Sequence, residues 1–262
     1  MSNAVGNIKT ITKRELGAYF ASPVAYVFIV IFLLLTGFFT FMVGGFFERD
    51  EASLISFFLW HPWLYLFLVP AVGMRLWSEE RRQGTLEFLL TMPITPWQAI
   101  VGKFLASWLF LALALFLTFP IVLTVRHLGS PDMGVIFCGY VGSWLLAGSY
   151  LAITCLTSAM TRNQVISFII SVVVCLLLIL AGWPPVTRFI EIFAQWNGVA
   201  GPLSALHIST TGLVDFVAAF SVMTHFDAMQ KGVVDSRDLL FFISVIGFSL
   251  FSTGVVLRNL RS

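Results

Sequence analysis

The chain has 262 residues, of which 58% are hydrophobic and only 11% are charged, and its mean hydropathy is +0.94. Soluble domains carry about 25% charged residues, so this composition excludes an ordinary soluble protein and indicates a lipid environment. The formal net charge of +2 gives no indication of a nucleic-acid partner.

Residues 7–21 predict an amphipathic helix that lies at the inner membrane surface. Its apolar side chains fall broadly on one side, and its basic residues Lys9, Lys13 and Arg14 lie elsewhere. Interfacial helices have this distribution of charge and apolar surface. The alternative is that the basic residues only anchor the first membrane span.

Six windows of the sequence contain no Asp, Glu, Lys or Arg. About 20 apolar residues in a helix cross the hydrocarbon core of a bilayer, and the runs lack the alternation of barrel strands. The first window is too long for a signal-peptide core, so we expect a retained span. The fold class is therefore predicted to be all-α, a single polytopic membrane domain over 1–262 with six transmembrane helices at 23–43, 53–74, 104–125, 134–160, 164–183 and 239–257.

Serine or threonine followed by proline marks three predicted helix starts. A hydroxyl caps the first free amides of a helix, and proline fits the first helical position. Ser22-Pro23 and Ser130-Pro131 precede the first and fourth windows, and Thr95-Pro96 with Gln98 forms a capping-box pattern. The third span is therefore expected to begin near Pro96. In the second span, Pro62 and Pro70 predict kinks.

The distribution of Lys and Arg predicts the orientation. With six spans, ten of the 15 basic residues lie on the side of the N-terminus and five on the other side. Because basic residues are retained in the cytoplasm, both termini and the loop between spans two and three should be cytoplasmic.

Residues 186–236 predict short amphipathic or re-entrant helices on the outer face, because their apolar pieces are too short to span and are interrupted by acidic residues. The three cysteines and four histidines are scattered, which argues against a metal site. No phosphate-binding loop, serine nucleophile elbow or zinc-protease motif occurs. We therefore expect no catalytic, cofactor-binding or metal-binding residues and no cofactor.

The segment 78–95 is charged, although it lies between two apolar windows. Ser78 is a candidate cap for a short helix, with Glu79 and Glu80 in its first turn, and Gly84 should interrupt it. A second turn could then begin at Thr85. The product is a short surface helix, which is either an ordinary solvated loop or a docking element for a cytoplasmic partner.

The stretch EERRQGTLEFLLTMPITPWQAIVGKF at 79–104 resembles the segment between spans two and three of type-2 ABC exporter permeases. In that family a glutamate, a basic stretch, Gly-Thr, an acidic residue, aliphatic residues, proline and a later Gly-Lys recur. Residues 57–90 and 225–242 also look like the gliding-motility-type (GldF-like) permeases, relatives of the NosY-type permeases. The residues that match the motif of the type-2 ABC exporter permeases are Glu80, Gly84, Thr85, Leu86, Glu87, Leu89, Leu90, Pro93, Gly102 and Lys103.

The resemblance implies a permease subunit in the bacterial inner membrane, working as a dimer with a second copy or a GldG-type subunit, and with a cytoplasmic ABC ATPase. In the family the charged segment is the coupling helix, which sits in a cleft of the ATPase. Rival interpretations are a non-transport scaffold and an integral membrane enzyme. The ATPase-coupling interface is predicted at Glu79, Glu80, Arg81, Arg82, Gly84, Thr85, Leu86, Glu87, Leu89, Leu90 and Pro93.

Overall fold

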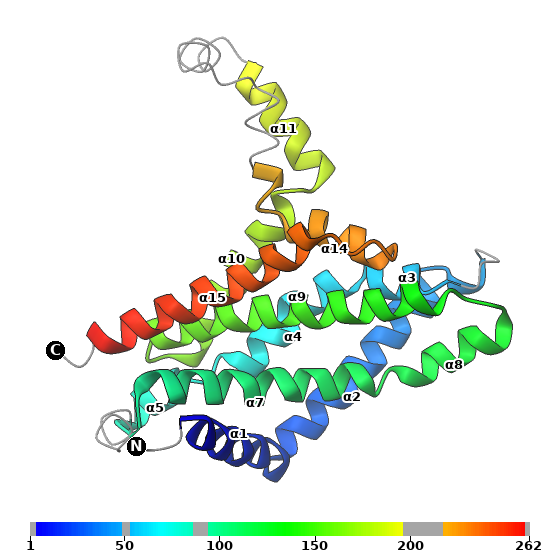
Figure 1. Cartoon of the computed structure of the whole chain (residues 1–262). Coiled ribbons are helices and arrows are strands. Elements are labelled where there is room, and N and C mark those ends of the chain that lie inside the picture. Colours follow the sequence, from blue (N-terminus) through cyan, green and yellow to red (C-terminus); the bar gives the residue numbers. More distant parts are fainter. Residues whose placement is uncertain (1–3, 49–52, 86–93, 196–216, 260–262) are drawn as a thin grey trace.

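A computed structural model describes residues 4–48, 53–85, 94–195 and 217–259, and every regular element in those ranges is a helix (Figure 1). This confirms the all-helical fold class for the described part of the chain. The α-helices are α1 (Ala4–Ala21), α2 (Pro23–Phe38), α3 (Ile55–Leu59), α4 (His61–Gly73), α5 (Ser78–Gln83), α7 (Pro96–Phe116), α8 (Phe119–Leu128), α9 (Met133–Met160), α10 (Gln164–Leu180), α11 (Pro184–Gln195), α14 (Val222–Gln230) and α15 (Ser236–Asn259), and α2 continues through a π-turn at Phe39–Val43 and a short helix at Phe46–Glu48.

Two of the three predicted helix starts are confirmed. The hydroxyl of Ser22 accepts from the Val24 amide at 3.3 Å, and Pro23 opens α2. Thr95 and Gln98 form the predicted capping box at the start of α7. The prediction at Ser130 is wrong, because the carboxylate of Asp132 caps α9 by accepting from the Gly134 amide at 2.8 Å. A charged carboxylate at that position also interacts favourably with the helix dipole.

Four helical runs are long and apolar enough to cross a membrane. They are Pro23–Glu48, Pro96–Leu128, Met133–Met160 and Ser236–Asn259, of 26, 33, 28 and 24 residues. Large apolar side chains on these runs are exposed, including Leu34 at 67% and Phe248 at 71%. Such surfaces require lipid or another apolar partner, as expected of a membrane protein.

Proline divides two of the windows that the sequence predicts as single spans. The second window, 53–74, contains α3 and α4, which meet at Trp60, just before Pro62. Helix α4 has only 13 residues. The third is broken between α7 and α8, where Thr118 precedes α8 and Pro120 lies in its first turn. Proline lacks the amide proton that a continuous helix needs, so the break falls just before it. The fifth window contains α10, of 17 residues.

Helix α9 forms the centre of the bundle, with α15, α4, α10, α14 and α7 packed around it (Figure 1). Its buried face includes Leu146, Tyr150 and Leu151, none of which is exposed. Trp108 of α7 stacks on Trp144 of α9 with ring centroids 4.1 Å apart, and its indole N–H donates to the Trp144 carbonyl at 2.9 Å.

Helix α1 runs beside the first half of α7 in the same direction (Figure 1). The hydroxyl of Thr12 donates to the Gly102 carbonyl at 3.2 Å, and the Tyr19 hydroxyl lies 2.9 Å from the Ser107 hydroxyl. A Cβ atom on Gly102 would lie 2.7 Å from the Ile11 side chain, so the close approach requires glycine at this position.

The outer segment predicted at 186–236 is described in part. Helix α11 overlaps its beginning, extends away from the bundle in Figure 1 and has 12 residues, whereas α14 packs on α9 and has nine. Each is shorter than the roughly 20 residues that a span needs. Residues 196–216 lie outside the described part.

Candidate functional site

The charged segment begins with α5, a single short helix whose end is set by one residue. Gly84 closes it in the left-handed conformation with φ +71°, a region that favours glycine. This confirms the predicted interruption. The prediction that Ser78 caps the helix is wrong, because Ser78 is its first residue and its hydroxyl donates to the Met74 carbonyl.

The beginning of α5 is attached to the end of α9 through Ser158. The Ser158 hydroxyl oxygen accepts from the amides of Trp77 and Ser78, both at 3.0 Å, and its proton is donated to the Met74 carbonyl at 2.9 Å. Trp77 is fully buried, and its indole N–H points to the sulfur of Cys155 at 3.2 Å. One hydroxyl therefore satisfies two of the amides that a helix start leaves without partners.

Two side chains of α5 extend this attachment to the connection between α9 and α10. Arg81 donates to the Ala159 carbonyl at 2.6 Å, where a cation also interacts favourably with the C-terminal end of α9. The carboxylate of Glu79 accepts a hydrogen bond from the side chain of Gln164, the first residue of α10. Movement of α5 would therefore displace α9 and α10 as well.

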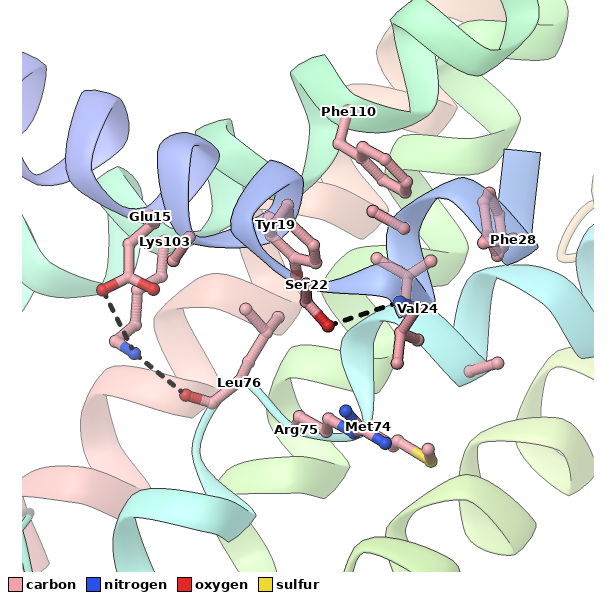
Figure 2. A pocket seen from close by; sticks show the side chains of 14 residues that line it. Glu15, Tyr19, Ser22, Val24, Phe28, Met74, Arg75, Leu76, Lys103 and Phe110 are labelled. Carbon is pink, nitrogen blue, oxygen red and sulfur yellow. Dashed lines mark hydrogen bonds and ion pairs between the residues drawn. The ribbon is translucent and has the colours of Figure 1, made fainter. Parts of the chain in front are cut away.

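Lys103 of α7 links the other side of α5 to the bundle. Its side chain is only 6% exposed, and its ammonium group lies 2.7 Å from the Glu80 carboxylate and 3.8 Å from that of Glu15 in α1. The same group donates to the Leu76 carbonyl at 3.2 Å and lies 5.3 Å from the centre of the Trp77 ring. Figure 2 shows Lys103 between Glu15 and the Leu76 carbonyl.

We call Lys103, Glu80 and Glu15 the ion cluster. Burying an ammonium ion costs several kcal/mol unless opposite charge and hydrogen bonds replace the lost water, and here both are present. Glu15 also accepts from Arg14 at 2.8 Å, so the two acids are balanced by two basic groups. The second carboxylate oxygen of Glu80 is buried and has no hydrogen-bond partner among the described residues.

The electrostatics of α5 differ between its two acidic residues. Hydrogen bonding from Arg82 at 2.8 Å lowers the pKa of Glu79 below its ordinary value, so Glu79 stays ionised. Burial lowers the pKa of Arg81, with a smaller effect of the same sign from Arg162. Glu80 instead faces inward and pairs with Lys103.

The structure divides the predicted coupling residues into three groups. Glu79, Glu80 and Arg81 are partly buried and contact the helix bundle, and Arg82, Gly84 and Thr85 are exposed. Leu86, Glu87, Leu89, Leu90 and Pro93 lie outside the described residues. Docking to an ATPase stays a prediction for the whole set.

Sequence reasoning missed Glu15, Ser158 and Gln164, and noted Lys103 only as part of a motif. The contacts that unite them connect residues 23 to 88 positions apart in the chain, which local patterns do not reveal. One signal was available for Lys103. It falls on the buried stripe of α7 formed by Ile100, Phe104, Ser107, Phe110 and Ala114, a spacing at which a lysine needs an internal partner.

A known protein family matches most of the chain. The model of a family described as ABC-2 family transporter protein matches residues 64–257, from within α4 to the last turn of α15. The chain belongs to the ABC-2 transporter family. It is a membrane permease subunit of a family whose members lack an ATPase domain and work with ATPase subunits. A search of curated proteins finds no match.

Proposed function

We propose that residues 78–95 form the coupling element of this ABC-2 permease, which receives movement from a cytoplasmic ATPase subunit and passes it to the membrane helices. The observation that carries the proposal is the one-sided attachment of α5. Its inner side contacts α7, α9 and α10, and reaches α1 through Lys103. Its outer side presents Arg82, Gln83 and Gly84 to solvent.

This attachment is suited to transmitting force. Close-packed interiors move as units, so a push on α5 would shift the attached helix ends instead of deforming a loose loop. The ion cluster and Ser158 connect α5 to both the α7 side and the α9 side of the bundle. A solvated loop, which is the rival interpretation, would not need two buried attachment points.

The wider assembly follows from the same proposal. We infer six spans, with α4 and α10 crossing in addition to the four long runs, both termini in the cytoplasm and placement in a bacterial inner membrane. The basic residues that favour this orientation are divided ten to five. The permease would pair with a second copy or with a permease-like GldG-type subunit, and residues 57–90 and 225–242 support a gliding-motility-type (GldF-like) relationship.

In this assembly, hydrolysis of ATP by the separate subunit would drive either export across the inner membrane or mechanical work on a partner at the outer face. The chain itself supplies no phosphate-binding loop. Purified permease alone should therefore show no ATP turnover, and hydrolysis that responds to the permease should appear once an ABC ATPase encoded by neighbouring genes is co-purified with it.

The decisive experiment separates docking from transmission. Replacing 86–92 with a Gly/Ser linker leaves α5 in place and removes Leu86, Leu89 and Leu90, which we propose as the apolar anchors of the interface. The ATPase should then no longer co-purify, since buried anchors contribute about 2 kcal/mol or more each. Lys103→Met should leave the exposed side of α5 intact and retain the ATPase, but should lower permease-stimulated hydrolysis.

Arg126→Gln is the matched control, because Arg126 is an exposed cation at the far end of α8. It should change neither assembly nor hydrolysis. Unchanged assembly and unchanged hydrolysis after replacing all of 79–92 with a Gly/Ser linker would contradict the coupling role and favour the solvated loop.

A further inference from the structure

A cavity of about 340 Å³ lies between α1, the start of α2, the end of α4 and α7. Sites for small ligands in proteins have volumes of about 300–1,000 Å³, so the cavity is large enough for part of an amphipathic molecule. Figure 2 shows Glu15 and Lys103 on one side of the cavity and Phe28 and Phe110 on the other.

The cavity lining changes from charged to apolar at the ends of the predicted membrane windows, which contain no Asp, Glu, Lys or Arg. Arg75 and Lys103 lie directly outside those windows, and Glu15 lies in α1, ahead of the first window. Val24, Phe28 and Phe110 lie inside them, within two turns of the window ends. The cavity therefore extends from the level of lipid headgroups into the level of lipid chains.

Arg75 gives the headgroup side of the cavity a surplus positive charge. Lys103 and Arg14 are balanced by Glu80 and Glu15. Arg75 is exposed and has no carboxylate within ion-pair distance in the part of the chain that the structure describes. An arginine in this position presents a planar set of donors that matches phosphate oxygens.

Ser22 supplies a second polar group at the same level. Its oxygen accepts from the Val24 amide at 3.3 Å, and its proton has no acceptor among the described residues. The hydroxyl is therefore available to donate to an anion beside Arg75. No lining acidic residue opposes such an anion except Glu15, which is already paired with Arg14 and Lys103.

We propose that this cavity binds one anionic phospholipid from the inner leaflet. Its phosphate would contact Arg75 and Ser22, and the first part of an acyl chain would lie against Val24, Phe28 and Phe110. The site goes beyond the coupling function, because it does not involve an ATPase and its ligand comes from the bilayer. A zwitterionic lipid carries its own cation, which would leave the charge of Arg75 without a net counter-ion.

Native mass spectrometry of the full chain, purified from bilayers of equal phosphatidylglycerol and phosphatidylcholine, tests the proposal. The wild type should retain one phosphatidylglycerol per chain after stepwise delipidation. Arg75→Gln should bind it roughly tenfold more weakly, because a hydrogen-bonded charge pair is lost. Ala71→Leu, which keeps Arg75 but fills the cavity beside the chain, should also lose the lipid.

Arg258→Gln is the control, because Arg258 is an exposed cation outside the cavity lining, and it should retain the lipid fully. Thermal unfolding of each variant shows whether it is folded, and Arg75→Gln, which changes an exposed side chain, should unfold like the wild type. Equal retention of the two lipids, or full retention by Arg75→Gln, would overturn the proposal. Binding of glycerol 3-phosphate to a chain that retains no lipid would also overturn it and would indicate a site for soluble phosphate.

Discussion

Lys103 shows how a single residue sets the local energetics of this permease. Its ammonium group is buried among a carboxylate at 2.7 Å, a backbone carbonyl at 3.2 Å and an aromatic ring. An intact buried ion pair contributes little net stability, because desolvation offsets the attraction. Removing one member is far more harmful, because a charge then stays buried without its partner.

The Lys103→Met variant should therefore be destabilised by roughly 3 kcal/mol, since the carboxylate of Glu80 would lose its counter-ion. Thermal unfolding of the purified chain in detergent measures the change. The double variant Lys103→Met/Glu80→Gln should recover part of the loss, because no unpaired charge then remains between α5 and α7.

Arg82→Met is the surface control for this test. The Arg82 side chain is 64% exposed and pairs only with Glu79 in the described part of the chain. Exposed pairs of this kind contribute less than about 1 kcal/mol. If Arg82→Met and Lys103→Met lower the stability of the chain by the same amount, the ion cluster has no special role in stability.

The depressed pKa of Glu79 predicts a dependence of stability on pH. A carboxyl group with a lowered folded-state pKa contributes stability above its ordinary value of 4.5, and this contribution is lost as pH falls through the lower folded-state value. Wild type and Glu79→Gln should therefore differ in melting temperature at neutral pH and converge as the pH falls below the lowered folded-state pKa. A difference in melting temperature between wild type and Glu79→Gln that stays constant into acid pH would show that Glu79 stabilises the protein by some means other than its charge.

At the scale of elements, α5 illustrates a helix that depends on its surroundings. It has six residues, and isolated helices shorter than about 12–15 residues are marginal in water. Its stability must come from Ser158, Lys103 and the Ala159 carbonyl. The direction in which the chain leaves α5 is fixed by Gly84.

Substitution of Gly84 should therefore change the segment that follows α5. A Cβ atom meets nothing within 4 Å there, but φ is +71°, so Gly84→Ala carries only the conformational cost of about 1 kcal/mol. That cost should weaken co-purification of the ATPase about fivefold. Gly84→Asn should lose less, because asparagine adopts this conformation more readily. The same loss for Gly84→Ala and Gly84→Asn would indicate that the side chain itself, and not the backbone conformation, disturbs docking.

The sequence predicted those elements whose signals are local. Ser22-Pro23 and Thr95-Pro96 marked two helix starts because a cap and a proline act within one turn. The third helix start is capped by Asp132 and not by Ser130. The two candidate caps lie close together in the sequence, and the charged one accepts the hydrogen bonds from the first amides of the helix. The ion cluster could not be predicted in this way, because Glu15, Glu80 and Lys103 come from three separate helices.

At the scale of the whole molecule, charge and helix length together determine how the chain can sit in a bilayer. Four runs are long enough to cross, and α4 and α10 are shorter than the windows that contain them. Composition reveals an apolar run but not the proline-dependent break within it, which explains why α4 is shorter than the second window. If α4 and α10 also cross, as proposed, α5 and the ends of α9 and α15 would lie on the same side as the N-terminus.

This topology predicts the labelling pattern of single cysteines in intact cells. The background should lack Cys138, Cys155 and Cys175, so that the probe reports only the introduced site. Gln83→Cys should resist a membrane-impermeant thiol reagent, because position 83 is exposed and the proposed topology places it on the cytoplasmic side. Lys231→Cys should react, because position 231 is exposed after α14 and the proposed topology places it on the outer face. Met229, two residues earlier, is buried and unsuitable as a reporter. After permeabilisation both should react, which controls for folding and access. Labelling at position 83 but not at 231 in intact cells would reverse the orientation and place the coupling element beyond the reach of a cytoplasmic ATPase.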